Sequence, residues 1–165
     1  MFVVKKLSDE VSAVAVLAAE IWREHYTPII GEAQVEYMLE KFQSAEQISR
    51  DISSNGHVYY IAVEEDIIVG YCCVIPHEDF LLISKLYVRK DHRGQGIAKG
   101  MLDEAIGLSG FDIIRLTVNK YNSKAIDAHK KNGFVIVDSV KKDIGGGFFM
   151  DDYVMELSLR EEKKL

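Results

Sequence analysis

The stretch from Asp79 to Ala98 limits what this chain can fold into more than any other part of it. Its first half, Phe80–Val88, is apolar and strand-like. Its second half carries R-G-Q-G at residues 93–96, and apolar residues then recur at helical spacing from Ala98 onward. We therefore expect a buried strand that enters a helix through a glycine turn.

A glycine turn at a helix start can bind an anion. The first turn of a helix leaves backbone N–H groups unpaired and carries roughly half a unit of positive partial charge. Gly94 and Gly96 have no Cβ, so the backbone there can approach a bulky oxyanion such as a phosphate ester. The dinucleotide fingerprint G-x-G-x-x-G is excluded because Lys99 stands at its third glycine, and the triphosphate loop G-x-x-x-x-G-K-[ST] is absent. An ordinary strand-to-helix turn accounts for these few residues equally well.

The length and composition of the chain predict one ordinary folded domain. Its 165 residues are the size of a single domain, so we expect residues 1–165 to form one unit. Hydrophobic residues make up 48% of the sequence and only two residues are proline, which is typical of a globular chain without low-complexity tracts. Cys72 and Cys73 are adjacent in an apolar run, where a bond between them would be strained, so we expect two buried free thiols.

The charge and the N-terminal segment indicate which partners to expect. A formal net charge of −6 disfavours nucleic acid, which needs a clustered basic face, and modestly favours a cationic substrate. The N-terminal segment lacks a long apolar core and a small-residue cleavage site, and no apolar run approaches membrane-spanning length. We therefore expect no membrane partner and a reducing, cytoplasmic location.

Turn and cap signals divide the rest of the chain into helices and strands. Ser8 can cap a first helix that Pro28 should break, and Ser44 with Gln47 forms a capping-box pattern for a short third helix. Asn122 and Gly133 mark the two ends of a later helix. The expected strands are Phe2–Lys5, His57–Val63, Ile67–Ile75, Phe80–Val88, Ile113–Val118, Phe134–Val140 and a last one through Tyr153, Met155 and Leu157. The order β-α-α-α-β-β-β-α-β-α-β-β predicts an α/β (mixed α+β) domain with a mixed sheet.

Two motifs resemble those of one enzyme superfamily. The strand ending in L-Y-V is followed by R-x-x-G-x-A at Arg93, Gly96 and Ala98, which resembles the pyrophosphate-binding motif of the GCN5-related N-acetyltransferases, or GNAT acetyltransferases. The later segment N-x-x-A-x-x-x-H-x-x-x-G-F, residues 122–134, resembles a second motif of this family, which most often has tyrosine where His129 stands. The resemblance covers nearly the whole chain. It implies a central twisted mixed sheet of about seven strands, helices on both faces, and a flared gap between the strands at Phe80–Val88 and Ile113–Val118.

The resemblance also implies acetyl-CoA as co-substrate and no metal. Main-chain groups of the focal strand would pair with the pantetheine arm, and the glycine turn would hold the pyrophosphate. The residues expected to bind the cofactor are Leu86, Tyr87, Val88, Arg93, Gly94, Gln95, Gly96, Ile97, Ala98 and Asn122.

The catalytic groups are less clearly indicated than the cofactor site. His129 could protonate the departing thiolate, because an imidazole with a pKa of about 6.5 can act as an acid toward a thiol with a pKa of about 8.5. Tyr121 or solvent is the alternative acid, and His129 could instead only pack against Ala125.

The general base is a separate question. Deprotonating an amine with a pKa near 10.4 costs roughly 4.6 kcal/mol at pH 7, so some group must accept the proton of the amine. Leu82 stands where relatives often have a glutamate. Glu78 and Asp79 could act as the base through water, or could be solvated turn residues.

The acceptor side resembles the bacterial polyamine acetyltransferases of the PaiA type. The resemblance lies in the segment with Trp22 and Tyr26, in K-L-Y-V at residues 85–88, and in G-G-G-F-F-M-D-D-Y at residues 145–153. Asp151 and Asp152 alternate faces in a strand, so only one can point into an acceptor cleft and bind an ammonium group. Trp22 and Tyr26 could present ring faces to a cation, or could belong to the core.

Three functions stay open at this point. The first is acetyl transfer to a primary amine of a polyamine or another small cationic amine. The second is acetylation of a peptide N-terminus or lysine, which would use the same cofactor residues. The third is a non-catalytic acyl-CoA-binding protein. The sequence leaves the oligomeric state open, with a homodimer as one option.

Overall fold

The computed structural model describes residues 1–159, in which seven strands form one mixed sheet. The strands are β1 Val3–Lys6, β2 Val58–Glu64, β3 Ile67–Pro76, β4 Leu81–Val88, β5 Ile113–Asn119, β6 Val135–Gly145 and β7 Phe148–Ser158. Their order across the sheet is β1-β2-β3-β4-β5-β7-β6. Neighbouring strands are antiparallel except for β4 and β5, which run parallel.

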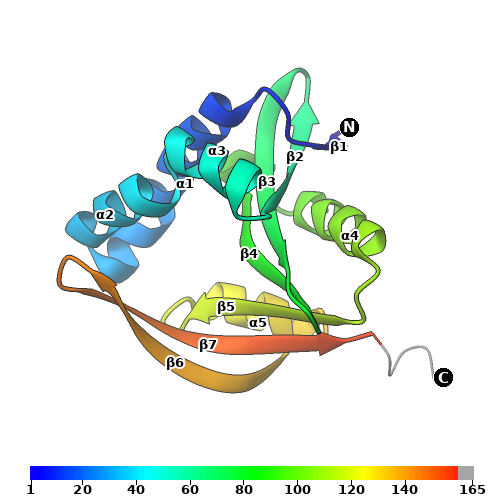
Figure 1. Cartoon of the computed structure of the whole chain (residues 1–165). Helices are drawn as coiled ribbons and strands as arrows, with labels where there is room; N and C mark the ends of the chain where they lie inside the picture. Colours follow the sequence, from blue (N-terminus) through cyan, green and yellow to red (C-terminus); the bar gives the residue numbers. More distant parts are fainter. Residues whose placement is uncertain (160–165) are drawn as a thin grey trace.

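Five α-helices of the described chain cover the sheet on both faces. They are α1 Val11–Ile30, α2 Glu32–Phe42, α3 Ala45–Ser54, α4 Ile97–Ser109 and α5 Ser123–Lys131, and a short 3-10 helix, Lys90–His92, precedes α4. One apolar cluster joins α1 and α3 to β2 and β3, and a second joins α4 and α5 to the opposite face of the sheet. Figure 1 shows α1 to α3 on one side of β3 and β4 and α4 on the other. The predicted order of elements, the mixed sheet and the two helical layers are confirmed.

Two local predictions for α1 are wrong. Ser8 is not its N-cap, because the Glu10 carboxylate accepts the Ser8 N–H at 3.0 Å and pairs with Lys5 at 3.1 Å, and the helix begins after Glu10. Pro28 does not break α1, which continues to Ile30. A proline near a helix end removes one main-chain hydrogen bond, and packing of Ile30 against α2 in an apolar cluster offsets this loss.

The parallel pair β4 and β5 separates after three residues. The paired residues are Leu81–Ile83 of β4 with Ile114–Leu116 of β5. Beyond them β4 continues to Val88 and β5 to Asn119, but the two strands no longer pair with each other. Ser84 is an extra residue in β4, because Cys73 of β3 lies opposite Lys85 while Val74 lies opposite Ile83. Such a bulge bends its strand. The two strands therefore diverge (Figure 1), and the expected flared gap is confirmed.

The β6–β7 hairpin reaches back across this gap to α2. The Tyr37 hydroxyl donates to the Ile144 carbonyl at 2.8 Å, and Gln34 Nε2 donates to the Phe149 carbonyl at 2.8 Å. The Tyr37 and Phe148 rings lie 5.2 Å apart. The hairpin tip and α2 thereby close one side of the space between the two halves of the sheet (Figure 1).

Candidate active site

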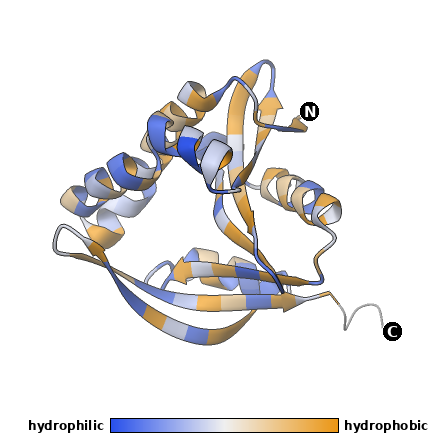
Figure 2. Cartoon of the chain, viewed as in Figure 1, coloured by the Kyte–Doolittle hydropathy of each residue, from blue (hydrophilic) through white to orange (hydrophobic). Residues whose placement is uncertain are grey.

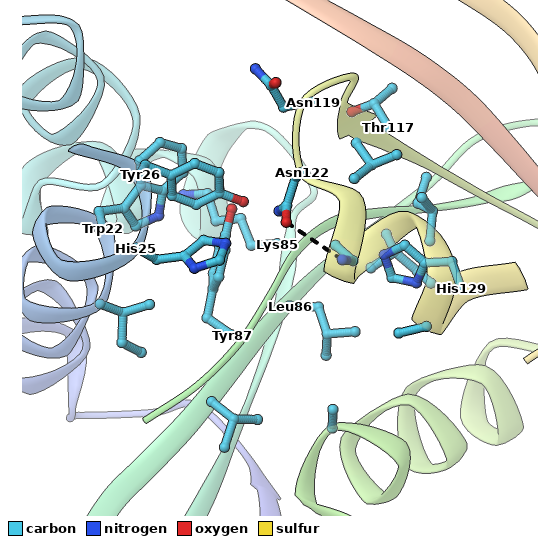
Figure 3. A pocket seen from close by; sticks show the side chains of 18 of the residues that line it. Trp22, His25, Tyr26, Lys85, Leu86, Tyr87, Thr117, Asn119, Asn122 and His129 are labelled. Atoms are coloured by element: carbon cyan, nitrogen blue, oxygen red, sulfur yellow. Dashed lines mark hydrogen bonds between the residues drawn. The ribbon is translucent and has the colours of Figure 1, made fainter. Parts of the chain in front are cut away.

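A cleft of about 720 Å³ occupies the gap between β4 and β5. Its wall is built from α1, α2, β4, the loop before α4, β5, α5 and β7. Figure 3 shows that side chains from α1 face those of α5 across the diverging strands. Most residues that the sequence nominated for function therefore meet in one place.

The glycine turn forms one end of this cleft. Gly94 and Gly96 both have φ of +79°, and Gly96 is the N-cap of α4. A Cβ added at either glycine would meet no atom within 4 Å, so the space beside the backbone is open. The first turn of α4 holds no acidic side chain that would compete with a bound anion. This open, left-handed turn at a helix start fits a pyrophosphate.

Arg93 is anchored next to this turn. Its Nε donates to the Val88 carbonyl at 3.1 Å, which ties the turn to the end of β4 and leaves the rest of the guanidinium at the cleft wall. Gly94, Gly96, Ile97 and Ala98 line the cleft as well, whereas Gln95 is exposed outside it. Leu86, Tyr87 and Val88 line it from the unpaired part of β4. Main-chain groups of β4 that lack a partner in β5 are thus available to an extended ligand.

The start of α5 faces the glycine turn from the other strand. Asn122 is buried in the cleft wall and caps α5, with Oδ1 accepting the Ala125 N–H at 3.4 Å (Figure 3). His129 lines the cleft two turns further along α5, and its ring lies 5.8 Å from that of Phe134. Burial lowers the pKa of His129, so the imidazole is neutral at pH 7.

Aromatic side chains form the opposite wall. The Trp22 ring lies 4.3 Å from Tyr26 and 5.7 Å from Tyr87. The hydroxyls of Tyr26 and Tyr87 lie next to each other and point toward Asn122 (Figure 3). Burial raises the pKa of Tyr26, so its hydroxyl keeps its proton and can donate a hydrogen bond into the cleft.

One carboxylate is buried in the cleft. Asp152 of β7 lines it, and burial, together with the charge of Asp151, raises its pKa to about 6, while Lys120 opposes the shift. Asp151 does not line the cleft and pairs with Lys120 at 2.8 Å. The two neighbours point to opposite faces of β7, so the cleft receives one negative charge above about pH 6.

Three of the four nominated catalytic residues lie outside the cleft. Glu78 and Asp79 are exposed in the turn between β3 and β4. Tyr121 is 71% exposed, just before α5. None of the three lines the cleft.

Lys85 and His25 line the cleft, although the sequence did not nominate either as a site residue. Lys85 of β4 is buried and donates to the Phe42 carbonyl at 2.5 Å and to the Tyr59 hydroxyl at 2.6 Å, and burial lowers its pKa to about 8. A lysine inside an otherwise apolar strand was the signal that could have identified it. His25 of α1 lines the cleft 4.8 Å from the Tyr26 ring. Burial lowers the pKa of His25, against an opposing interaction with Asn122, and no local pattern in the sequence distinguishes this histidine.

The two cysteines are buried free thiols, as expected, and neither lines the cleft. Burial raises the pKa of both Cys72 and Cys73 to about 12, so neither is a ready nucleophile. Within residues 1–159, no three His, Cys, Asp or Glu side chains stand close enough together to hold a metal ion. No helix of that range has both the length and the apolar character that crossing a membrane requires.

Comparisons with known proteins agree with this geometry. The sequence model of the "Acetyltransferase (GNAT) family" matches residues 17–134. N-alpha-acetyltransferase 50 of Danio rerio is 31% identical over 119 residues, which cover 67% of this chain and 71% of that protein.

Solved structures share the fold over nearly the whole chain. The PaiA N-acetyltransferase of Thermoplasma acidophilum, in complex with coenzyme A, superposes with a TM-score of 0.80 at 23% identity, covering 96% of this chain and 99% of that one. The ribosomal-protein-S18-alanine N-acetyltransferase of Escherichia coli superposes with a TM-score of 0.68 at 15% identity, covering 96% and 94%. Sequence, fold and the open glycine turn beside a split sheet thus lead to one conclusion: the chain belongs to the GNAT family and is an acetyl-CoA-dependent acetyltransferase.

Proposed function

We propose that this enzyme transfers the acetyl group of acetyl-CoA directly to a primary amine of a small cationic acceptor such as a polyamine. The observation that carries the proposal is Asp152, the buried carboxylate of the cleft, which would pair with one ammonium group of the acceptor. A polyamine has a second nitrogen that can react while the first is held. The aromatic faces of Trp22 and Tyr26 add a cation-binding wall.

The closed side of the cleft supports a small acceptor. The hydrogen bonds of Tyr37 and Gln34 to the β6–β7 hairpin join α2 to the hairpin at the far side of the gap. An extended peptide that crossed the cleft would have to separate them. A short flexible amine enters without that cost.

Acetyl-CoA would supply an activated acyl group as a thioester. We propose that the backbone of residues 94–98 and Arg93 hold its pyrophosphate, that the unpaired part of β4 holds the pantetheine arm, and that Asn122 contacts it from α5. The open turn with positive φ at Gly94 and Gly96 supports this arrangement.

The protein would contribute mainly by positioning the two reactants. We propose that backbone N–H groups of β4 stabilise the oxyanion and that His129 donates an N–H hydrogen bond to the departing sulfur. The neutral state that burial gives His129 suits a hydrogen-bond donor at pH 7. Glu78 and Asp79 are exposed, so either could act as the base only through water. Tyr121 is exposed as well, so it could act as the acid only through water.

A second acceptor class has its own support. The Danio rerio relative is named as an N-alpha-acetyltransferase and shares 31% of its residues with this chain over 119 positions. An enzyme for the N-terminal amine of a protein would use the same cofactor residues and differ only at the acceptor side.

A release assay for free CoA distinguishes the two classes. Purified enzyme is supplied with acetyl-CoA and either spermidine, a panel of short peptides with free N-termini, or amino acids. We expect kcat/KM for spermidine to exceed that for every peptide at least tenfold, and mass spectrometry to find one added acetyl group. A preference for a peptide would replace the polyamine proposal by the N-terminal one.

A further inference from the structure

Strand β6 leaves one whole edge of the sheet without a partner. It is the last strand in the sheet order, and β7 is the one strand of the described chain with which it pairs. It is 11 residues long, and no strand among residues 1–159 pairs with its outer edge. Side chains bond some of its main-chain groups: Asp138 Oδ1 accepts the Ser139 N–H at 2.7 Å, and the Tyr37 hydroxyl donates to the Ile144 carbonyl at 2.8 Å. A long unpaired edge is a template for another strand.

The side chains of this edge are unusually apolar for a solvent-facing strand. Val135, Ile136, Val137 and Val140 are between 41% and 59% exposed. Figure 2 shows orange, hydrophobic segments along β6, which is the edge strand at the opposite end of the sheet from β1. Exposed apolar residues on a long edge strand are a feature that monomeric proteins usually avoid.

We propose that two copies of this chain pair through β6, antiparallel, to form one continuous sheet around a two-fold axis at Val140. In two paired antiparallel strands, directly opposite residues have their side chains on the same face of the sheet. Two identical strands related by a two-fold axis meet this condition only if one residue lies directly opposite the same residue of the second copy. The choice of that residue fixes every other contact across the interface.

The charges of β6 select Val140 as the centre. Asp138, Val140 and Lys142 lie on one face of β6, because they pair with Val154, Asp152 and Met150 of β7. With Val140 facing its own copy, Asp138 faces Lys142 of the second copy, and the symmetry makes this ion pair twice.

Neighbouring registers lack this complementarity. With Ser139 at the centre, Asp138 would face an apolar Val140. With Lys141 at the centre, two lysines would face each other, which is destabilising. Lysines on an edge strand usually prevent pairing, but here each Lys142 has an acidic partner in the second copy.

The proposed interface leaves the active-site cleft open. β6 contributes no residue to the cleft wall, and β7, which carries Asp152, lies between β6 and the cleft. Binding of acetyl-CoA can therefore be measured as a folding control for interface variants, independently of the acceptor proposal.

Sedimentation equilibrium and light scattering on the full chain test the interface. We expect the wild-type protein to have twice the chain mass at micromolar concentration. Asp138→Lys alone and Lys142→Asp alone each place like charges opposite each other, so each should raise the dimer dissociation constant at least tenfold. The double variant Asp138→Lys/Lys142→Asp restores both ion pairs in exchanged order, and its dimer should return to within a few-fold of wild type.

Two further variants locate the contact. Val140→Lys places a charge on the two-fold axis and should give a monomer with unchanged acetyl-CoA binding. Val16→Lys, on an exposed valine of α1 that is 71% exposed, should remain a dimer. A monomeric wild type, a Val140→Lys variant that stays dimeric, or a double variant that does not recover would each overturn the proposal.

Discussion

Gly96 and Gly110 lie at the two ends of α4 with nearly the same backbone conformation, φ of +79° and +75°. Neither would place an added Cβ within 4 Å of another atom. Asparagine tolerates this left-handed conformation better than other residues with a side chain. We therefore expect Gly96→Asn and Gly110→Asn to cost similar, small amounts of stability, about 1 kcal/mol each.

The two variants should differ sharply in ligand binding. Gly96→Asn places a side chain where the pyrophosphate would lie, so affinity for CoA should fall at least a hundredfold. Gly110 lies outside the cleft, and Gly110→Asn should bind CoA as wild type does. Isothermal titration calorimetry measures both, with thermal melts to compare stability. Equal CoA affinity of the two variants would rule out the glycine turn as the phosphate site.

Asp152 sets an expected pH dependence for the acceptor. Because burial raises its pKa to about 6, the carboxylate is charged only above that pH and becomes neutral as the pH falls through 6. The kcat/KM for a cationic acceptor should therefore carry an acid limb near pH 6. Asp152→Asn should lose this limb and raise KM for the amine at least tenfold, with KM for acetyl-CoA unchanged, in steady-state assays across pH 5 to 8.

Asp151→Asn is the matched control for that measurement. The Asp151 charge helps to raise the pKa of Asp152, and its removal also leaves Lys120 free to lower that pKa. The acid limb should move to lower pH without a large loss of activity. An unchanged limb in Asp152→Asn would assign it to another group.

Lys85 connects two layers of the molecule. Its ammonium joins the last carbonyl of α2, from Phe42, to Tyr59 of β2. The Tyr71 hydroxyl of β3 donates to Oε1 of Gln43, the residue after Phe42, at 3.1 Å. Phe42, Gln43 and Lys85 all line the cleft, so these contacts fix the floor of the proposed acceptor region.

The pKa of Lys85 predicts a stability effect at alkaline pH. The folded-state pKa is about 8, below the 10.5 of an unperturbed lysine, so between these values the unfolded chain binds more protons than the folded one. Stability of the wild type should therefore rise with pH in this window, by about 2 kcal/mol from pH 8 to pH 10 for this group alone.

Urea denaturation of wild type and Lys85→Met at both pH values measures this effect. The variant lacks the titrating group. The free energy of unfolding of the wild type minus that of Lys85→Met should therefore be about 2 kcal/mol larger at pH 10 than at pH 8. Other groups that titrate in the window cancel in the difference. A constant or decreasing difference would show that Lys85 is not desolvated in the folded protein.

Local signals in the sequence predicted the elements well. Ser44 accepts the Gln47 N–H at 3.2 Å as the N-cap of α3, Asn122 caps α5, and Gly133 adopts φ of +94° just after it. Each depends on a few neighbouring residues, which is why one sequence was enough to find them.

Contacts between distant segments were not predictable in the same way. Pro28 stays inside α1 because Ile30 has partners in α2, and Lys85 is buried because the end of α2 meets β4. The bonds between α2 and the β6–β7 hairpin join residues more than 100 positions apart. Neither the floor nor the closed side of the cleft has a local pattern, so the acceptor side was the less predictable half of the site.

The molecule as a whole consists of two halves around one gap. β1 to β4 with their helices form one half, and β5 to β7 with α5 form the other (Figure 1). Two sets of contacts hold the halves together, one at each side of the gap. They are the three residue pairs between β4 and β5 and the hydrogen bonds between α2 and the β6–β7 hairpin. The cleft lies between them, with the open glycine turn at the start of α4 and the buried carboxylate of Asp152 on β7.

A crystal structure of the enzyme with CoA is the most direct measurement of this arrangement. We predict pyrophosphate oxygens within hydrogen-bonding distance of the backbone N–H groups of residues 94–98, and a pantetheine arm lying along the unpaired part of β4 between β4 and β5. CoA bound elsewhere, or a structure in which side chains fill the gap and exclude it, would contradict the account.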